Sequence, residues 1–350
     1  MDYRVLKADL EKDGPEIIQF WDTQFHGWPV QKFDWFYRNN PAGPGDCWIA
    51  REPKGNTIVG SIACFPKRMI VDGTRVTVGL GGDLGVNSDH RRQGLALALR
   101  KLMIANKDDA GYPFLVGTPN ARSARITERA GYTIIGGLKR MVKVLHARSY
   151  VQRVVKVGAL AGVLSKPVDG VMALTSKERK FRNSGLYRYE ILTEFDERFN
   201  TLAVEGAKQY RMVADRSAEF LNWRFPGCPY KSFRAFALSD AKSSRLLGYV
   251  VFRTDDHEIS INDLFTVDNR TMLAPLIGEF LLWARSEGIN TVTMFFFGHS
   301  AMYESFDEFG FKMRPDDRIK VIVYADQDSP YHELAYSAEN WHFTNGDNDV

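Results

Sequence analysis

The chain has 350 residues, of which 44% are hydrophobic and 25% are charged, and its formal net charge is +3. This composition is typical of a folded globular protein and excludes a chain dominated by disorder. So small a net charge gives no argument for binding nucleic acid, and the length predicts two domains around separate cores.

The first residues, "MDYRVLKADLEKDG", predict a strand followed by an acidic helix start, and they show no secretory signal. Cys47, Cys64 and Cys228 are far apart and form no CxxC pair. This spacing predicts reduced thiols in a cytoplasmic protein and argues against a structural zinc site. The seven histidines show no HxH or HExxH spacing, so the sequence predicts no metal centre.

Strand-like and helical patterns alternate in the first half. Residues 47–52 and 57–65 flank the turn residues "PKGN" and predict a hairpin, and a second hairpin turns at Asp72-Gly73. A further strand runs into residues 83–86. Helical spacing follows Gly94 and stops at Gly111, and the next predicted elements are a buried strand at 114–117, a helix from Asn120 to Gly131, and strands at 132–135 and 140–145.

The same order of elements recurs later in the chain. Strands are predicted at 232–238, 245–253 and 259–267, then a helix through Trp283, a strand at 292–297 and a helix ending at Gly310. Single residues correspond at an offset of about 180 to 190 residues, including Asp83 with Asp263, and "FDWFYRNNP" at 33–41 with "FLNWRFPGCP" at 220–229. We interpret this as a duplicated domain. The alternative is that two segments of mixed α and β structure are similar by chance.

The predicted organisation is therefore a first domain at 1–145, a linker at 146–185, a second domain at 186–325 and a polar tail at 326–350. The linker mixes apolar residues with Arg153, Lys156 and Lys166 and ends in the basic run Lys177, Arg179, Lys180 and Arg182. Its apolar stretch is too short to span a bilayer. It predicts either a helix packed between domains or a basic helix on an anionic membrane surface. The last residues of the tail, "ENWHFTNGDNDV" at 339–350, are polar and are expected to be loose unless Trp341 and Phe343 tether them.

The segment "DLGVNSDHRRQGLALALR", residues 83–100, places a glycine loop between a strand and a helix. Backbone N–H groups in such a loop, together with the positive end of the helix, form an anion site suited to a pyrophosphate. Gly94 allows close approach of the backbone, Ala96 leaves room in the first turn, and Arg91 and Arg92 add charge-assisted bonds. The alternative is an ordinary tight turn with solvated arginines.

The same segment resembles the acetyl-CoA signature of the GNAT acyltransferase superfamily, through Leu84 and Val86 followed by Arg91, Gly94 and Ala96. "NARSARITERAGY" at 120–132 resembles the second signature of that family. The whole chain further resembles tandem-GNAT proteins linked to polysaccharide or other cell-envelope biosynthesis. The resemblance implies an α+β fold: two tandem domains, each with a mixed, mostly antiparallel sheet flanked by helices, the second copy degenerate.

The resemblance also implies that acetyl-CoA or another acyl-CoA binds the first domain as acyl donor. Its pantetheine arm would enter a wedge where strand 83–86 splays from strand 114–117, and a backbone N–H there would stabilise the oxyanion. Asn120 would contact the donor from the facing helix, unless it serves only as that helix's N-cap. The implied contact residues are Leu84, Gly85, Val86, Arg91, Arg92, Gln93, Gly94, Leu95, Ala96, Asn120 and Ser123.

The acceptor implied by the resemblance is a small-molecule amine, with an amino sugar or envelope precursor as the expected kind. Asp83 is the best-placed carboxylate to remove the amine's proton, which requires burial or a water relay to raise its pKa. The alternative is a buried Asp that holds a strand bulge, since Asp263 repeats it. Thr127 stands where many GNAT enzymes have a tyrosine acid, so no acid is assigned, and solvent or Tyr132 remain open.

The second copy lacks the glycine signature. Pro275 is expected where a phosphate-binding backbone would offer N–H groups, His299 replaces the leading Asn and Phe306 the usual Tyr, so this half is not expected to bind CoA. This half is expected to form one side of the acceptor cleft. The candidate lining residues are Trp35, Tyr37, Trp223 and Arg224, and the alternative is that they pack in the core. Other functions left open are a silent acyl-CoA-binding scaffold and an aminoacyl transferase of the peptidoglycan-bridge type. The sequence leaves the acceptor, the acyl length and the oligomeric state undetermined.

Overall fold

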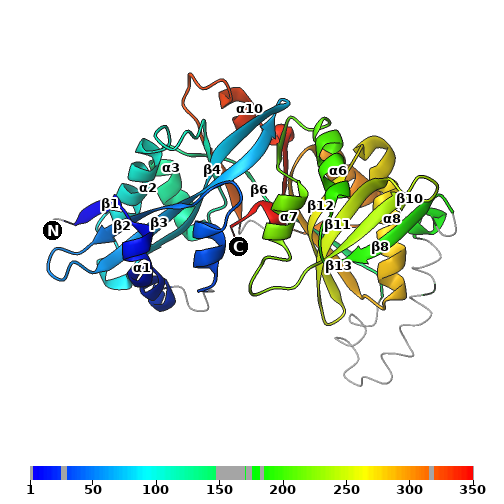
Figure 1. The fold of residues 1–350 in the computed structure, drawn as a ribbon, viewed down its shortest axis with the longest axis horizontal. Helices are drawn as coiled ribbons and strands as arrows, with labels where there is room; N and C mark the ends of the chain where they lie inside the picture. Colours follow the sequence, from blue (N-terminus) through cyan, green and yellow to red (C-terminus); the bar gives the residue numbers. More distant parts are fainter. Residues whose placement is uncertain are drawn as a thin grey trace.

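The protein is described here by a computed structural model that covers residues 3–24, 30–146, 170, 176–181, 185–314 and 319–349. Two similar halves lie side by side along the long axis, with the N-terminus at the outer end of the first half and the end of the chain between the halves (Figure 1). The described strands form one sixteen-stranded sheet that runs through both halves. The predicted α+β class is confirmed.

The first half begins with strand β1 (Arg4–Lys7) and helix α1 (Leu10–Gln24), which the π-helix η1 (Phe33–Arg38) follows. Strands β2 (Asp46–Arg51), β3 (Ile58–Val71) and β4 (Thr74–Val86) form the main antiparallel part of the sheet. The sequence predicted two hairpins and a separate strand, but β3 and β4 are each continuous. Their turn at Asp72-Gly73 has both φ angles positive, +45° and +76°, as a tight hairpin requires.

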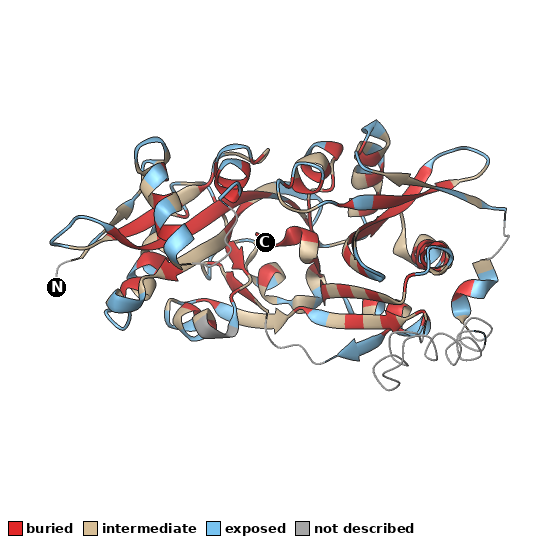
Figure 2. Cartoon of the chain, turned by 90° about the horizontal axis from the view of Figure 1, so that it is seen from below, coloured by how far each residue is buried: buried red, intermediate tan, exposed pale blue. Residues whose placement is uncertain are grey.

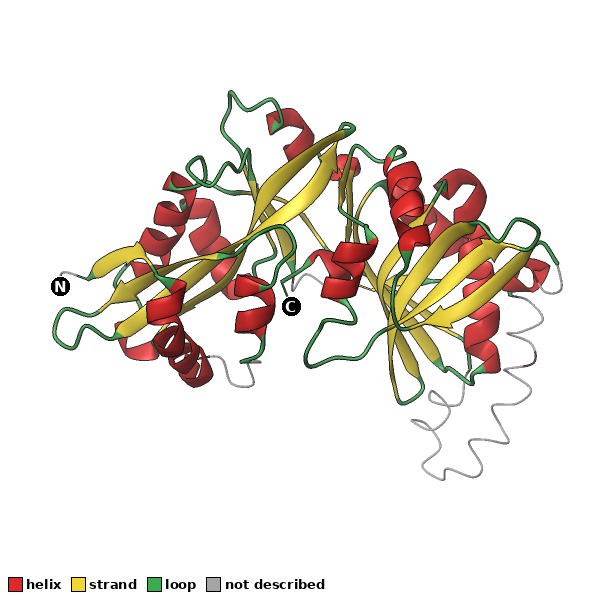
Figure 3. Ribbon diagram, in the orientation of Figure 1, coloured by secondary structure: helices red, strands yellow, loops and turns green. Residues whose placement is uncertain are grey.

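The helices of the first half cover both faces of this sheet (Figures 1 and 3). After the short helix η2 (Ser88–His90), α2 (Leu95–Ala105) packs Leu99 over Gly60, whereas Trp21 of α1 binds the neighbouring Ser61 from the other side. Successive strand residues point to opposite faces, so α2 and α1 lie on opposite faces. Strand β5 (Leu115–Gly117), helix α3 (Ala121–Arg129) and strands β6 (Thr133–Gly137) and β7 (Lys139–Val144) follow.

The second half repeats this order, which confirms two copies of one plan. The predicted elements are β10 (Arg234–Asp240), β11 (Leu246–Asp255), β12 (Glu258–Thr266), α8 (Asn269–Ser286), β13 (Thr291–Gly298) and α9 (Ser300–Glu308). They are preceded by β8 (Tyr187–Leu192), α6 (Glu197–Ala207), β9 (Met212–Ala214) and α7 (Ala218–Arg224), and followed by β14 (Lys312–Arg314) and β15 (Lys320–Tyr324).

The two halves exchange equivalent strands. Strand β7 belongs by sequence to the first half, but it pairs with β13 and β14 of the second. Strand β15 belongs by sequence to the second half, but it lies between β5 and β6 of the first. The division into domains 1–145 and 186–325 stays a prediction. The sheet itself does not follow that division, because each half supplies one strand of the other's sheet.

The described part of the tail, 326–349, is folded, and the side chains of Trp341 and Phe343, the two possible tethers of residues 339–350, are buried. The tail contains α10 (His332–Tyr336), η4 (Ala338–Asn340), strand β16 (Trp341–Thr344) and η5 (Asn345–Asp347). Strand β16 is buried and pairs with β13 on one side and β9 on the other, and β9 pairs with β3. The tail thus joins the two halves of the sheet. Buried residues lie along strands in both halves and near the end of the chain (Figure 2).

Part of the predicted linker packs against the second half. Helix η3 (Lys177–Phe181) lies on α8, where Phe181 covers Gly278 and the buried Glu178 binds Lys143 and Arg285 at 3.2 and 3.0 Å. Arg153, Lys156, Lys166 and Arg182 lie outside the described residues, and so does the membrane-surface helix considered for this segment. In the described parts of the chain, every helix is too short or too polar to cross a bilayer.

Candidate active site

Strands β4 and β5 diverge where the sequence predicted a wedge. They pair in parallel from Gly79 to Gly81, and the last pair is Gly81 with Gly117. Beyond it, β4 continues to Val86 in pairing with β3 alone. The register slips between Ser61 and Ala63, and the bulged residue opposite this slip is Asp83, with φ of +48°. A β-bulge bends its strand, which turns Leu84, Gly85 and Val86 away from β5 and leaves one edge of their backbone open.

The loop formed by residues 91–96, hereafter the diphosphate loop, presents unbonded backbone donors. Arg92 and Gly94 have φ of +64° and +80°, and nothing lies within 4 Å of a Cβ built on Gly94. Helix α2 starts with Leu97 and Ala98 donating to the carbonyl of Gly94 at 3.1 and 3.0 Å. Among the described residues, the amides of 92–96 have no hydrogen-bond acceptor. A helix start with free N–H groups is an anion site.

Arginines flank this loop on its exposed side. Arg91, Arg92 and Gln93 are exposed, and Nε of Arg91 donates to the carbonyl of Val86 at 3.1 Å. The Arg91 side chain therefore folds back over the end of β4, while its charge stays at the rim of the loop.

The predicted residues of α3 are held within their own helix. The side chain of Asn120 accepts from the amide of Ser123 at 3.2 Å, and the Ser123 hydroxyl donates to the carbonyl of Asn120 at 3.2 Å. Asn120 is thus a helix cap, and its contact with a donor stays a prediction. The Thr127 side chain is fully buried and donates to the carbonyl of Ser123 at 2.8 Å, so its hydroxyl is not directed at the wedge.

A buried cluster of charged groups stands at the bulge. We call Lys32, Tyr37, Asp83 and Asp349 the acid–lysine cluster. Nζ of Lys32 lies 2.7 Å from Oδ1 of Asp83 and 3.3 Å from Oδ2 of Asp349, and the Tyr37 hydroxyl donates to Oδ2 of Asp83 at 2.9 Å. The side chains of Lys32, Asp83 and Asp349 are 2%, 6% and 12% exposed. Among the described groups, one ammonium thus faces two carboxylates, so these groups carry an excess negative charge when both carboxylates are ionised.

Burial governs the proton affinities in this cluster. Burial raises the pKa of Asp83, Lys32 opposes that shift, and the neighbouring Asp349 adds to it. Burial alone would lower the pKa of Lys32, but the two carboxylates outweigh it and leave that pKa raised. Lys32 therefore stays charged, and Asp83 holds a proton more readily than an exposed aspartate does.

Asp349 lies directly over the apex of the wedge. A Cβ added to Gly82 would lie 2.3 Å from Oδ2 of Asp349. Gly82 follows the last residue that pairs with β5, so the carboxylate stands where the two strands separate. Only a glycine leaves it this space, because any side chain at position 82 would displace it.

The second half contains a matching bulge with a different environment. Oδ2 of Asp263 accepts from the hydroxyl of Tyr249 at 2.7 Å and lies 2.9 Å from Nε of Arg216, and Oδ1 accepts from the Thr344 hydroxyl at 2.9 Å. A cation and a tyrosine thus hold the bulge aspartate in both halves. Asp263 is fully buried, whereas the side chain of Asp83 is 6% exposed.

The wedge of the second half is filled by the chain itself. Strand β12 pairs with β13 only as far as Ile261 and Met294, and β16 then pairs with β13 from Phe296 to Gly298. The His342 ring bonds the carbonyl of Leu264, the counterpart of Leu84, at 3.1 Å. Residues 341–344 therefore occupy the space that is open in the first half.

The start of α8 is likewise closed to an anion. Its N-cap Asp268 accepts from the amide of Arg270, which places a carboxylate where an anion would have to bind. Pro275 was expected at this position, but it is buried in the interior of α8, so the proline is not what closes the site. His299 caps α9 by accepting from the amide of Ala301 at 3.1 Å.

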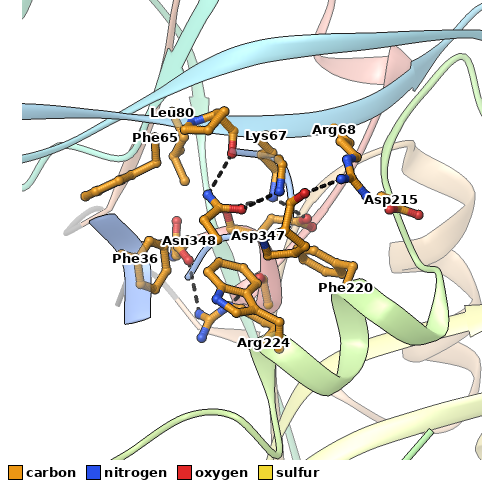
Figure 4. A pocket seen from close by; sticks show the side chains of 16 residues that line it. Phe36, Phe65, Lys67, Arg68, Leu80, Asp215, Phe220, Arg224, Asp347 and Asn348 are labelled. Carbon is orange, nitrogen blue, oxygen red and sulfur yellow. Dashed lines mark hydrogen bonds and ion pairs between the residues drawn. The ribbon is translucent and has the colours of Figure 1, made fainter. Parts of the chain in front are cut away.

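Of the candidates for the acceptor cleft, Trp35, Trp223 and Arg224 pack between the halves, whereas Tyr37 binds Asp83 within the first half. Trp35 and Tyr37 are buried, and Arg224 donates to the carbonyls of Gly346 and Asn348 at 2.8 and 3.0 Å. Figure 4 shows Phe36 and Phe65 of the first half and Phe220 and Arg224 of the second around Asp347 and Asn348. The cavity enclosed there is about 20 Å³, room for about one water molecule, so it cannot take an acceptor.

Sequence reasoning missed Lys32 and Asp349. Lys32 directly precedes the segment 33–41 that matches 220–229, so comparison with Arg216 could have indicated a cation ahead of each repeat. Asp349 had no such signal, because only the fold carries the tail back to the first half. In the part of the chain that the structure describes, no three His, Cys, Asp or Glu side chains gather as a metal site.

Residues 3–135 match the family model described as "Acetyltransferase (GNAT) domain". A GCN5-related N-acetyltransferase from Anabaena variabilis superposes with a TM-score of 0.64 at 16% identity, covering 92% of this chain and 72% of that one. A probable N-acyltransferase of unknown function from Enterococcus faecalis gives a TM-score of 0.63 at 12% identity, covering 93% and 73%.

The Saccharomyces cerevisiae N-myristoyltransferase with bound myristoyl-CoA gives a TM-score of 0.57 at 11% identity, covering 92% of this chain and 82% of that one. No curated protein matches in sequence. At these identities the likeness of the solved structures concerns the fold, and it extends over both halves.

Proposed function

Because residues 3–135 form a domain of the acetyltransferase (GNAT) family, we propose that the protein transfers an acyl group from acyl-CoA to a primary amine. The observation that carries this proposal is the set of unbonded amides at residues 92–96, beside a wedge that is open only in the first half. The N-myristoyltransferase whose fold is similar holds myristoyl-CoA, which is consistent with an acyl-CoA donor here.

The diphosphate loop would bind the pyrophosphate of CoA. Its free N–H groups and the positive end of α2 favour an anion, and the open space above Gly94 lets phosphate oxygens reach the backbone. Arg91 and Arg92 would add charge at the exposed rim. Gln93, Leu95 and Ala96 contribute through their backbone positions in the same loop.

The open edge of β4 would bind the pantetheine arm. Leu84, Gly85 and Val86 have lost their pairing with β5, so their backbone groups can bond an extended ligand as if it were an added strand. One N–H of this edge would also face the thioester oxygen. A backbone donor at such an oxyanion contributes roughly 3 to 4 kcal/mol in other acyl-transfer enzymes.

The acid–lysine cluster would receive the acceptor. Its excess negative charge attracts an ammonium group, and Asp83 or Asp349 would take the proton that the amine must lose before it attacks. The amine nitrogen then bonds the thioester carbon, the carbon–sulfur bond breaks, and the CoA thiolate leaves and takes a proton. The raised pKa of Asp83 makes it a stronger base than an exposed aspartate.

The source of the thiolate's proton lies outside these residues. Thr127 is bonded within α3, and Tyr132 is buried with its pKa raised by that burial. A buried phenol in this state gives up its proton less readily than an exposed one, so solvent is the proposed donor.

A silent acyl-CoA-binding protein is the second candidate. The observations that favour it are the engaged Thr127 hydroxyl and the filled wedge of the second half. It predicts tight CoA binding without release of thiol in the presence of amines such as glucosamine, spermidine or lysine. An aminoacyl transferase that uses aminoacyl-tRNA has no such support, because the diphosphate loop is intact.

The test is thermal unfolding with and without CoA in wild type, Gly94→Asp and Gly73→Asp. Both glycines have similar φ, +80° and +76°, and both have open space around the missing Cβ, so backbone strain is matched. CoA at about 100 times its Kd should stabilise wild type and Gly73→Asp by roughly 2.7 kcal/mol. It should leave Gly94→Asp unchanged, because the new carboxylate repels the pyrophosphate. Equal stabilisation of all three would refute the proposed site.

A further inference from the structure

A second charged residue lies at the apex of the wedge, on the face opposite Asp349. The Arg100 side chain of α2 projects there between the helix and the sheet. A Cβ built on Gly81 would lie 3.4 Å from its Nη1. Gly81 and Gly82 point to opposite faces, so Arg100 stands on the donor side and Asp349 on the other side.

Arg100 is buried without a counter-ion. The residue is 4% exposed, and among the described side chains it forms no ion pair. Its guanidinium carbon lies 5.3 Å from the ring centre of Tyr132, which is 3% exposed. Neither Nε of Arg100 nor the hydroxyl of Tyr132 meets hydrogen-bond geometry with a described group.

This arrangement differs from the other buried cations of the protein. Lys32, Lys67, Lys107, Lys143 and Arg216 each bind at least one carboxylate, and Arg224 donates to backbone carbonyls. A buried guanidinium without such a partner costs folding free energy, and the contact with one aromatic ring offsets only part of it. The remaining inner positions of α2 are apolar, namely Leu95, Leu99 and Met103. An arginine among them is therefore explained better by a ligand than by packing.

The position of the Arg100 guanidinium relative to the wedge indicates which part of the ligand it would contact. If the pantetheine arm binds along residues 84–86, the acyl group extends past the thioester toward Gly81, where β4 and β5 rejoin. Strand residues are spaced about 3.3 Å apart, so the three steps from Leu84 to Gly81 span about 10 Å. The hydrogen bond from the guanidinium to a carboxylate takes about 3 Å of this length, which leaves room for an acyl chain of about four to six carbons that ends in a carboxylate. The far end of a short acyl chain would thus lie beside the guanidinium.

We propose that Arg100 binds a carboxylate at the far end of the acyl group, so that the donor is the CoA thioester of a short dicarboxylic acid, of the succinyl type. This inference rests on the proposed function and narrows its donor. The two charged sites are consistent with this chemistry, because the cationic amine would approach the carboxylates on one face and the anionic acyl end would meet Arg100 on the other. Tyr132 supplies a second donor to the same carboxylate.

The test is calorimetric binding of free CoA, butyryl-CoA and succinyl-CoA. The two thioesters have equal carbon number and differ in a terminal methyl or carboxylate. Wild type should bind succinyl-CoA about tenfold or more tighter than butyryl-CoA, the effect of a charge-assisted bond in a buried site. Arg100→Met should bring the ratio to about one while its butyryl-CoA affinity stays within about twofold. Lys101→Met, an exposed cation on the same helix, should keep the wild-type ratio.

The outcomes separate the two proposals. If free CoA binds but wild type does not distinguish the thioesters, the carboxylate proposal is wrong and the CoA site stands. If neither CoA nor its thioesters bind, the proposed function fails. A melting temperature of Arg100→Met equal to or above wild type is expected, because an unpaired buried charge is removed. Should Arg100→Met not fold, the arginine is structural, unless Arg100→Lys folds and shows an intermediate ratio.

Discussion

Trp35 and Trp223 bind each other's backbone across the boundary between the halves. The indole Nε1 of Trp35 donates to the carbonyl of Trp223 at 2.8 Å, and Nε1 of Trp223 donates to the carbonyl of Trp35 at 3.1 Å. The two residues come from the matching segments 33–41 and 220–229. The repeated motif thus holds the two copies together.

We expect Trp35→Phe to lower the free energy of unfolding by about 1 to 2 kcal/mol, because it removes a buried hydrogen bond and leaves the carbonyl of Trp223 without its donor. Trp48→Phe is the matched control, since the buried Nε1 of Trp48 has no partner and its loss breaks no bond. Urea denaturation measures both. An equal cost for the two variants would show that ring volume, and not the reciprocal bond, stabilises this contact.

The charge of Asp349 should affect the pKa of Asp83. Because the charge of Asp349 contributes to the raised pKa of Asp83, Asp349→Asn should lower that pKa. If Asp83 is the base, the acidic limb of kcat/KM for thiol release from the acyl-CoA donor then moves to lower pH in this variant. Asp83→Asn should reduce kcat by about 100-fold or more and leave CoA binding unchanged. A limb that stays in place in Asp349→Asn, with a large loss of kcat, would assign the proton transfer to Asp349 instead.

His342 should make stability depend on pH. Burial, with a contribution from Arg216, lowers its pKa from 6.5 to about 4, so the folded protein binds fewer protons than the unfolded chain between these values. The stabilisation is complete above about pH 6.5 and is lost as the pH falls toward 4, by up to about 3 kcal/mol. In His342→Gln, the free energy of unfolding should change less between pH 6.5 and 4 than it does in wild type, which denaturation at several pH values measures. An unchanged slope between pH 6.5 and 4 would contradict the assignment.

The filled wedge of the second half predicts one CoA site per chain. Residues 341–344 occupy the space next to β13, and Asp268 caps α8. Isothermal titration with CoA should give a stoichiometry near one, and Gly94→Asp should abolish all of it. Residual binding of a second CoA by Gly94→Asp would mean that β16 can leave the wedge.

The sequence predicted what local patterns control. Turn residues, helical spacing and the Gly94 loop gave the order of elements, the repeat and the place of the wedge, since each depends on neighbouring residues. It could not predict pairing between distant segments. The course of β16, the exchange of β7 and β15, and the approach of Asp349 to Lys32 depend on contacts between segments that lie about 50 to 300 residues apart, which no short pattern encodes.

The position of Pro275 shows a second limit of prediction from the sequence, which is the accuracy with which the two copies can be aligned. The alignment of the copies placed it at a helix start, but α8 begins at Asn269, so the proline falls in the interior of the helix. Matching residue types aligned the two copies only to within about two helical turns, since Pro275 lies six residues after the start of α8. The carboxylate of Asp268, which was not singled out from the sequence, is the feature that closes this site.

The exchange of β7 and β15 has a consequence for how the protein is made. While the ribosome is still adding the second half, the gap between β5 and β6 has no strand to fill it, because residues 320–324 are translated about 200 residues after β5. During translation the edges of β5 and β6 therefore stay unpaired, or are covered by chaperones, until nearly the whole polypeptide has emerged. Premature termination would therefore release a fragment with an unpaired sheet edge, which is prone to aggregate.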